Sequence, residues 1–262
     1  MKCGAIKSKI DIRDYTIDSN VELPEEFQLT GLPAVKNQHD VCSCVAFVAS
    51  EIAEYFEIKQ CKNRDRLSAG YIYGTRYEYT GKGMYLRDAL KTLKNKGICK
   101  QTRFIYNREV PEIIEKLKQS DITSKDTEHC RITTYFRCRT IEDIKAAIYS
   151  KRPVMLAVDW HDDNYFLKNE PFVLYPGEKN VGGHAIFVYG WNKEGLLFQN
   201  SWGTSWGNKG RAILSYEYPI KEAWGVSDEY IEPDTRNGIL KEIWRIICKM
   251  INSILNIILY KD

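Results

Sequence analysis

A thiol at position 44 stands at the start of a run of helix-forming residues, 44–59. The free N–H groups and the positive dipole end of a helix N-terminus favour the thiolate, which lowers the pKa of such a cysteine below the ordinary value of about 8.5. Gln38 lies six residues earlier. Its side-chain amide and the backbone N–H of Cys44 could together hold negative charge on an attacked carbonyl oxygen. This spacing predicts a nucleophilic cysteine beside an oxyanion hole.

A cysteine nucleophile also needs a base, and the base needs a group that orients it. His184 follows two glycines at the start of an apolar run, and Asn200 lies 16 residues later in the next β-rich run. A hairpin would bring these two side chains together, so that the imidazole takes the thiol proton and the Asn oxygen accepts the other ring N–H. His184 and Asn200 are therefore the candidate base and orienting residue.

The same residues can also be interpreted as structural residues without a catalytic role. A buried cysteine is more often an inert small apolar residue than a nucleophile. Cys42 and Cys44 have the wrong spacing for zinc, since zinc sites favour roughly two to four intervening residues and a second ligand pair. HExxH, phosphate-loop and GxGxxG motifs do not occur in the sequence, so no metal or organic cofactor is expected. The remaining histidines lack such neighbours and are predicted to lie on the surface: His39, His129 and His161.

The elements that must carry these residues divide the chain into two halves. Helical patterns occupy 44–59, 67–79, 86–96 and 111–118, and the wide apolar stripe of the first predicts a deeply buried helix. The second half has β-rich runs at 132–137, 153–160, 184–191, 196–201 and 211–216, and a helix at 141–149 that Thr140 and Asp143 would cap. Residues 1–37 are expected to be irregular. Segregated helices and antiparallel strands predict an α+β fold with two subdomains.

Three sequence blocks together resemble the active-site blocks of papain-family cysteine peptidases (family C1). Q-x5-C-x-A-F begins at Gln38, G-G-H-A contains His184, and N-S-W-G-T-S-W-G begins at Asn200. The order and approximate spacing of the three blocks match the family, and the resemblance covers residues 25–230. Within this range, segments 67–71 and 85–90 match as well. The chain is more similar to compact bacterial and viral members than to the lysosomal enzymes.

This resemblance implies a papain-like fold: a helical left subdomain, an antiparallel β-barrel-like right subdomain, and an active-site cleft between them. It implies that Cys44 is the nucleophile, His184 the general base and acid, Asn200 the orienting residue and Gln38 the oxyanion donor. Trp202 would cover the His–Asn hydrogen bond. The predicted substrate-binding residues are Trp202, Gly83 on the non-primed wall, Gly183, Ala185 and, near the main specificity pocket, Ala157.

Several positions depart from the family pattern. Val45 stands where Trp is usual, and Val41 where a disulfide-forming cysteine is usual. Cys42 replaces a common glycine beside the nucleophile, and we expect it to be a small residue that fills the space; a redox partner or a steric block are the alternatives. Only 37 residues precede Gln38, so a long helical propeptide is not expected. Whether residues 1–20 lie across the cleft stays open.

Composition and charge set the remaining expectations. The 262 residues are 44% hydrophobic and 28% charged, with a net charge of +3. That surplus arises from residues 236–262, so the rest has no net charge to hold nucleic acid. We divide the chain into an N-terminal extension (1–24), a peptidase domain (25–235) and an amphipathic C-terminal helix (236–262). Polar residues on one face of 238–260 predict packing, self-association or binding to a membrane surface.

The expected function is that of an endopeptidase that hydrolyses peptide bonds through a thioester on Cys44, with a peptide or protein as substrate. A catalytically inactive peptide-binding module is one alternative, motivated by Val45 and Cys42. A transpeptidase or isopeptidase that uses the same thiol is another. The start of the chain lacks an apolar leader, so mostly reduced thiols in an intracellular, reducing compartment are expected.

Overall fold

The computed structural model describes residues 4–11, 14–16, 21–76, 81–105, 107–128, 130–167 and 170–228. The chain divides into two compact units, Met1–Glu229 and Tyr230–Asp262. All described residues belong to the first unit. The helix predicted at 236–262, and the contacts predicted for it, lie outside the described residues.

Helix α1 (Cys44–Cys61) carries the predicted nucleophile at its first residue. Val45, Ala46, Ala49 and Ile52 are fully buried. Only a few of its residues reach the surface, as expected for an interior helix that is apolar on nearly every side. The predicted deep burial is therefore confirmed.

Shorter elements surround α1 in the helical half. They are α2 (Ala69–Gly74), β3 (Met84–Tyr85), α3 (Leu86–Asn95), α4 (Glu112–Lys118) and the 3-10 turn η1 (Ser124–Asp126). The sequence predicted a longer second helix, over 67–79. In the structure Ser68 is the N-cap and accepts a hydrogen bond from the Tyr71 N–H, so the helix begins only at Ala69, and it ends at Gly74. The capping preference of serine outweighs the apolar pattern here.

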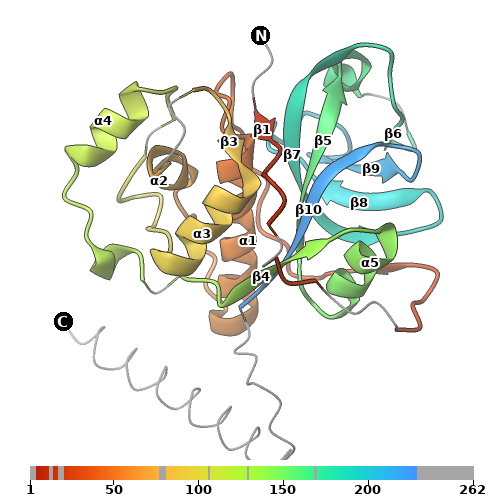
Figure 1. Cartoon of the computed structure of the whole chain (residues 1–262), viewed down its shortest axis with the longest axis horizontal. Coiled ribbons are helices and arrows are strands. Elements are labelled where there is room, and N and C mark those ends of the chain that lie inside the picture. The colour runs from red at the N-terminus through yellow and green to blue at the C-terminus, as the bar shows by residue number, and fades with distance from the viewer. Residues whose placement is uncertain are drawn as a thin grey trace, which may run out of the picture. The chain divides into compact units, whose positions relative to one another are not determined.

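The other half is a curled sheet (Figure 1). It runs in the order β4 (Thr134–Cys138), β10 (Ile220–Ser227), β5 (Val154–His161), β7 (Asn180–Trp191), β8 (Gly195–Gln199), β9 (Arg211–Ser215) and β6 (Val173–Leu174). All neighbours are antiparallel except β6 and β9, and β2 (Phe27–Gln28) also pairs with β7. Helix α5 (Ile141–Tyr149) has the predicted capping box of Thr140 and Asp143. The predicted α+β architecture, with a helical half and a mainly antiparallel sheet half, is confirmed.

Strand β10 was not predicted. Its sequence mixes Lys221, Glu222 and Gly225 with apolar residues, which hides the strand pattern. Tertiary pairing decides its conformation, since β10 lies between β4 and β5 and bonds to both. Such tertiary override is ordinary for strands, whose stability depends on cross-strand neighbours.

The N-terminal segment also differs from the irregular structure expected for it. Strand β1 (Ala5–Ile6) pairs in parallel with β3, with Ala5 opposite Met84. Figure 1 shows this segment running along the line where the helical half meets the sheet. We call residues 4–8 the strap. Its contacts extend to both halves, because the Ser8 N–H donates to Glu222 in the sheet, 2.8 Å away, while the Ser8 hydroxyl accepts from the Arg87 N–H of α3.

A buried ion pair holds the chain just before the predicted oxyanion donor. The Lys36 ammonium lies 2.7 Å from Glu54 on α1, and it also donates to the Ser50 hydroxyl and the Leu67 carbonyl. Both charged side chains are almost completely shielded from solvent. Because Lys36 is only two residues from Gln38, this pair anchors the loop that leads to the cleft.

Removing the Lys36 ammonium should destabilise the protein strongly. We expect Lys36→Ala to lower the free energy of unfolding by about 3–5 kcal/mol, because it leaves the buried Glu54 carboxylate with only the partly exposed Arg66 guanidinium, 4.0 Å away, as a charge partner. Lys118→Ala is the matched control: it breaks a 2.8 Å pair with Glu115 that is largely exposed, and should cost at most about 1 kcal/mol. Urea unfolding followed by circular dichroism measures both. Equal losses in the two variants would contradict the assigned role of Lys36.

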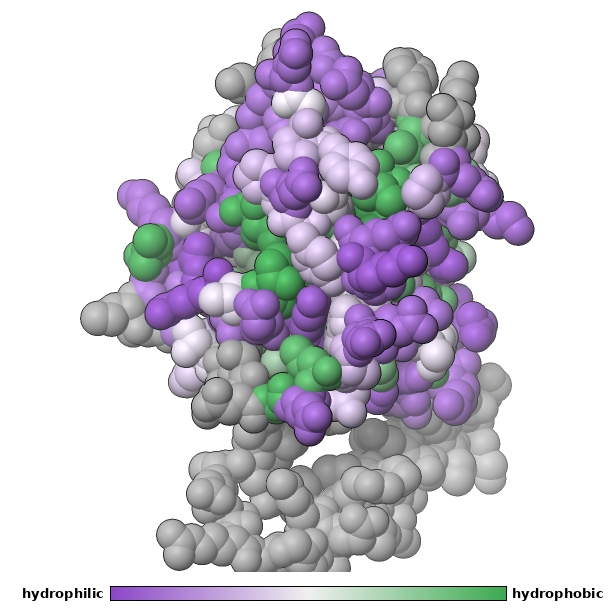
Figure 2. Space-filling view, turned by 90° about the vertical axis from the view of Figure 1, so that its right-hand side faces the viewer, coloured by the Kyte–Doolittle hydropathy of each residue, from purple (hydrophilic) through white to green (hydrophobic). Residues whose placement is uncertain are grey.

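The outer face of the sheet half is mainly hydrophilic. Figure 2 shows small separate apolar patches among polar side chains on this side. Among the helices of the described residues, none combines the length and apolarity required to cross a bilayer.

Candidate active site

The predicted base and its orienting residue meet across two neighbouring strands. His184 lies on β7 and Asn200 follows β8, and the ring Nε2 of His184 is 2.8 Å from Asn200 Oδ1. Asn200 Oδ1 also accepts the Ser201 N–H at 2.8 Å, which identifies this atom as the oxygen. An oxygen cannot donate, so Nε2 carries the proton and Nδ1 is left as the basic ring nitrogen.

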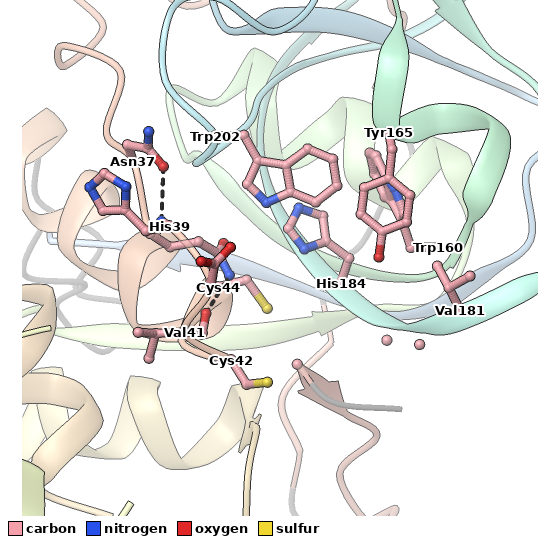
Figure 3. Close-up of a pocket in the computed structure, with 15 residues that line it drawn as sticks. Asn37, His39, Val41, Cys42, Cys44, Trp160, Tyr165, Val181, His184 and Trp202 are labelled. Atoms are coloured by element: carbon pink, nitrogen blue, oxygen red, sulfur yellow. Dashed lines mark hydrogen bonds between the residues drawn. The ribbon is translucent and has the colours of Figure 1, made fainter. Parts of the chain in front are cut away.

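Aromatic rings enclose the His184 imidazole. The ring centroid of Trp202 lies 4.9 Å from it, and Trp160 on β5 lies edge-on at 4.6 Å. Tyr165 stacks on Trp202, with ring centroids 5.2 Å apart and an interplanar angle of 11°. Figure 3 shows these rings grouped on one wall of the pocket. Trp202 contacts the imidazole of His184, and its predicted role in covering the His184–Asn200 hydrogen bond stays a prediction; the sequence did not single out Trp160 or Tyr165.

Gln38 is held from two sides. Its Oε1 accepts a hydrogen bond from the Ser201 hydroxyl at 2.6 Å, and its Nε2 donates to the Val41 carbonyl at 2.8 Å. The Gln38 N–H also donates to the Ser201 carbonyl. An amide nitrogen has two protons, so one remains for an oxyanion. Ser201 was missed as a positioning residue, although it directly follows Asn200 in the sequence.

A pocket of about 540 Å³ brings the predicted catalytic residues together. Cys44, His184 and Gln38 all line it. In Figure 3 the thiol of Cys44 lies beside the imidazole of His184 at this pocket. Asn200 is fully buried and contacts the pocket through its hydrogen bond to His184. The pocket thus brings together Gln38 and His184, which are 146 positions apart in the sequence.

Burial sets the protonation of the thiol and the imidazole. It raises the pKa of Cys44 to about 11, an effect that hydrogen bonds from the backbone of Ala185, Val45, Cys44 and Ala5 offset only in part. Burial also lowers the pKa of His184 to about 4, against the opposing effect of its hydrogen bond to Asn200. Both groups are therefore neutral near pH 7 in this conformation. The thiolate expected from the helix N-terminus is not favoured while the site is covered.

The strap provides that cover. Gly4 adopts φ of +114°, and a Cβ built on it would overlap the Gly183 carbonyl oxygen and lie 3.4 Å from the Cys44 sulfur. A Cβ on Gly83 would overlap the Gly4 carbonyl, and one on Gly183 the Ala5 carbonyl. Three glycines thus allow the strap to enter between the two walls of the cleft. The sequence left open whether residues 1–20 lie across the cleft. In the structure the strap does so, with Gly4 lining the pocket of Cys44 and His184.

The predicted substrate-binding residues fall into two groups. Gly183 and Trp202 line the pocket, and Gly83 contacts the strap. Ala157 and Ala185 face each other on β5 and β7 and are fully buried. The two alanines therefore lie behind the cleft surface in this conformation, and their role in binding stays a prediction.

Two predictions from the sequence are wrong. His161 is buried rather than on the surface, because its Nδ1 lies 2.8 Å from the Tyr218 hydroxyl. Cys42 is not a plain space-filling residue, because it forms a disulfide. His39 is exposed as predicted, while His129 lies outside the described residues. Across the described residues, no group of three or more His, Cys, Asp or Glu side chains is placed to hold a metal ion.

Comparison with known proteins agrees with this geometry. The model of the papain family cysteine proteases matches residues 23–229. An uncharacterised peptidase C1-like protein of Acanthamoeba polyphaga mimivirus is 26% identical, covering 84% of this chain and 83% of that protein. A cysteine protease of Blomia tropicalis is 25% identical over 76% of this chain and 63% of its own length.

Solved structures show the same fold. Xylellain, a cysteine protease from Xylella fastidiosa, superposes with a TM-score of 0.75 at 23% identity, covering 87% of this chain and 96% of xylellain. Bromelain from Ananas comosus in complex with the E64 inhibitor has a TM-score of 0.62 at 20% identity, covering 79% of this chain and all of bromelain. The family match over most of the chain and the shared architecture lead to one conclusion: this chain belongs to the papain family of cysteine proteases.

Proposed function

We propose that this protein is a cysteine endopeptidase that hydrolyses peptide bonds through a thioester on Cys44. One observation carries the proposal: the bond from His184 to Asn200 leaves the second ring nitrogen basic, in the same pocket as a thiol at a helix N-terminus. Such an arrangement of nucleophile, base and orienting group is what acyl transfer by a cysteine requires.

The reaction follows from these positions. His184 takes the Cys44 proton, and the thiolate attacks the substrate carbonyl carbon. The Gln38 amide and the Cys44 N–H stabilise the resulting oxyanion. The imidazolium then donates its proton to the leaving amine, which leaves an acyl thioester. Water, deprotonated by His184, attacks the thioester and restores the thiol. Asn200 keeps the ring oriented throughout.

Labelling tests the proposal directly. An epoxide-type thiol trap should modify Cys44 and not Cys61, which is also a free thiol and is exposed. The same preparation should cleave members of a peptide library, and mass spectrometry of the products should show free carboxylates. Amide or isopeptide products would indicate a transferase instead. Labelling elsewhere, or no cleavage by protein whose Cys44 reacts, would count against the peptidase.

The Gln38 amide should matter for turnover but not for thiol reactivity. We expect Gln38→Ala to lower kcat by about 10²-fold, the usual loss for one oxyanion donor, while the epoxide still labels Cys44. Ser201→Ala should give a smaller loss, because it frees the amide without removing it. Steady-state kinetics and labelling rates measure the two effects. An unchanged kcat in Gln38→Ala would remove Gln38 from the oxyanion hole.

A further inference from the structure

The loop from Gln38 to Cys42 carries the proposed oxyanion donor and leads directly into the N-terminus of α1. A short segment of the helical half, 107–109, holds this loop at two points. The Asn107 side-chain amide donates to the Gln38 carbonyl oxygen at 2.8 Å, and the Glu109 carboxylate accepts the Cys42 N–H at 2.6 Å. The partners are 69 and 67 positions apart along the chain, so only the fold joins them.

The bond to Glu109 fixes the peptide unit between Val41 and Cys42. At the other end of this unit, the Val41 carbonyl oxygen accepts the Gln38 side-chain N–H at 2.8 Å and the Ser43 N–H at 2.8 Å. Figure 3 shows Val41 and Cys42 beside Cys44 at the pocket. A peptide unit is planar, so turning its N–H away from Glu109 would also turn its carbonyl away from the Gln38 amide. The carboxylate therefore controls the direction of that amide.

The carboxylate of Glu109 is itself held in place. Its Oε2 accepts the Tyr73 hydroxyl at 2.9 Å, while its Oε1 accepts the Cys42 N–H. The Arg76 guanidinium lies over the Tyr73 ring, 4.1 Å from the ring centroid, and donates to the Gly83 carbonyl. Glu109 is thus fixed before any substrate binds, and the groups that it orients need no rearrangement during the reaction.

We propose that Glu109 is a positioning residue of the oxyanion hole, which orients the Gln38 amide through the Val41–Cys42 peptide unit. This inference rests on the proposed function, because an oxyanion forms only if a substrate carbonyl is attacked. Glu109 is not among the described residues that line the pocket, so it acts through Gln38. Its loss should slow the step in which negative charge develops on the oxygen, and should leave substrate binding and thiol reactivity unchanged.

Steady-state kinetics of the full-length protein on a fluorogenic peptide measures this effect. We expect Glu109→Ala to lower kcat by about tenfold and to change KM by less than about twofold, because the amide stays but is no longer held in direction. Glu109→Gln should keep kcat within about threefold of the wild type, since its amide oxygen still accepts the Cys42 N–H. Glu115→Ala, the matched control, removes an exposed carboxylate from the same half and should leave both constants unchanged.

A double-mutant cycle shows whether Glu109 acts through Gln38. In a protein that already carries Gln38→Ala, Glu109→Ala should lower kcat by no more than about twofold further. Tyr73→Phe is a milder variant that releases one carboxylate oxygen; it should cost about threefold in the wild type and nothing in Gln38→Ala. A further loss of about tenfold in the Gln38→Ala background would overturn the inference. So would a wild-type kcat in Glu109→Ala, or a Glu109→Gln variant as slow as Glu109→Ala.

Binding of a peptide aldehyde separates this inference from the proposed function. The Cys44 sulfur bonds to the aldehyde carbon and the thiol proton passes to the oxygen, so the adduct places an oxygen in the oxyanion hole although no peptide bond is cleaved. Glu109→Ala should weaken this binding by about tenfold.

Iodoacetamide provides the control for thiol reactivity. Its reaction displaces iodide and forms no oxyanion, so it should alkylate Cys44 at the same rate in Glu109→Ala and in the wild type. Weaker aldehyde binding in Glu109→Ala, with no peptide hydrolysis by the wild type, would support the positioning role and contradict the peptidase proposal. Hydrolysis by the wild type with an unchanged kcat in Glu109→Ala would contradict the positioning role and leave the peptidase proposal intact.

Discussion

Replacing Cys44 with alanine is expected to lower kcat/KM for peptide hydrolysis by at least about 10⁴-fold, as removal of a catalytic nucleophile does in other acyl-transfer enzymes. Without the sulfur, no thioester can form. Cys44 is fully buried and deletion of one sulfur atom leaves only a small void, so the variant should still fold. Initial rates on a fluorogenic peptide, measured on reduced protein, give the ratio.

The control for this prediction is Cys99→Ala, which removes a thiol that is equally buried but lies away from the pocket. It should keep the wild-type rate per folded molecule. Retention of more than about a tenth of the activity by Cys44→Ala would show that another group performs the attack.

The second large effect concerns the pH at which Cys44 reacts. With the strap in place, burial raises the pKa of Cys44 to about 11, so the thiolate fraction at pH 7 is about 10⁻⁴. Alkylation should be slow below that pKa and accelerate as the pH rises through it. Once the strap leaves, water reaches both groups, and the imidazolium and helix N-terminus should bring the midpoint below about 8.5.

The Gly4→Val variant tests whether the strap is what raises the pKa of Cys44. Its side chain would overlap the Gly183 carbonyl at a φ that disfavours β-branched residues, so the strap should leave the cleft. Adding His184→Ala should return the midpoint to about 8.5, because the charge partner is lost. The rate of iodoacetamide labelling against pH, read by mass spectrometry with Cys61 as internal reference, measures both shifts. Equal midpoints for wild type and Gly4→Val would exclude the strap as the cause.

Both predictions concern the thiol of Cys44, whose charge depends on how far the site is desolvated. Desolvation keeps water away from the His184–Asn200 hydrogen bond, but it also disfavours a charged thiolate and a charged imidazolium. While residues 4–8 cover the cleft, the second effect keeps the thiol and the imidazole neutral. We expect that removing the strap, without rearranging the catalytic side chains, changes the charge state of Cys44 and His184. Because His184, Asn200 and Gln38 are already hydrogen bonded in place, the site needs only to be opened.

Local sequence alone determined much of this protein. The capping box of α5 follows from a short-range capping rule, and the helix that begins at Cys44 follows from the helix-forming run of its residues. The three active-site blocks indicated the family and the order of the candidate catalytic residues. The fold can bring these residues into one site only if they occur in this order along the chain. In the structure Gln38, Cys44 and His184 line one pocket, and Asn200 is hydrogen bonded to His184.

Tertiary structure decided the rest. The strand character of β10 and the burial of His161 depend on neighbours far away in the chain, Met155 and Tyr218 among them. The placement of Gly4 against Gly83 and Gly183 is likewise a long-range contact. A one-dimensional pattern encodes which residues prefer a helix, a strand or a turn, but desolvation and pairing arise only when distant segments meet. For that reason the sequence identified the thiol, while the fold decided whether it carries a charge.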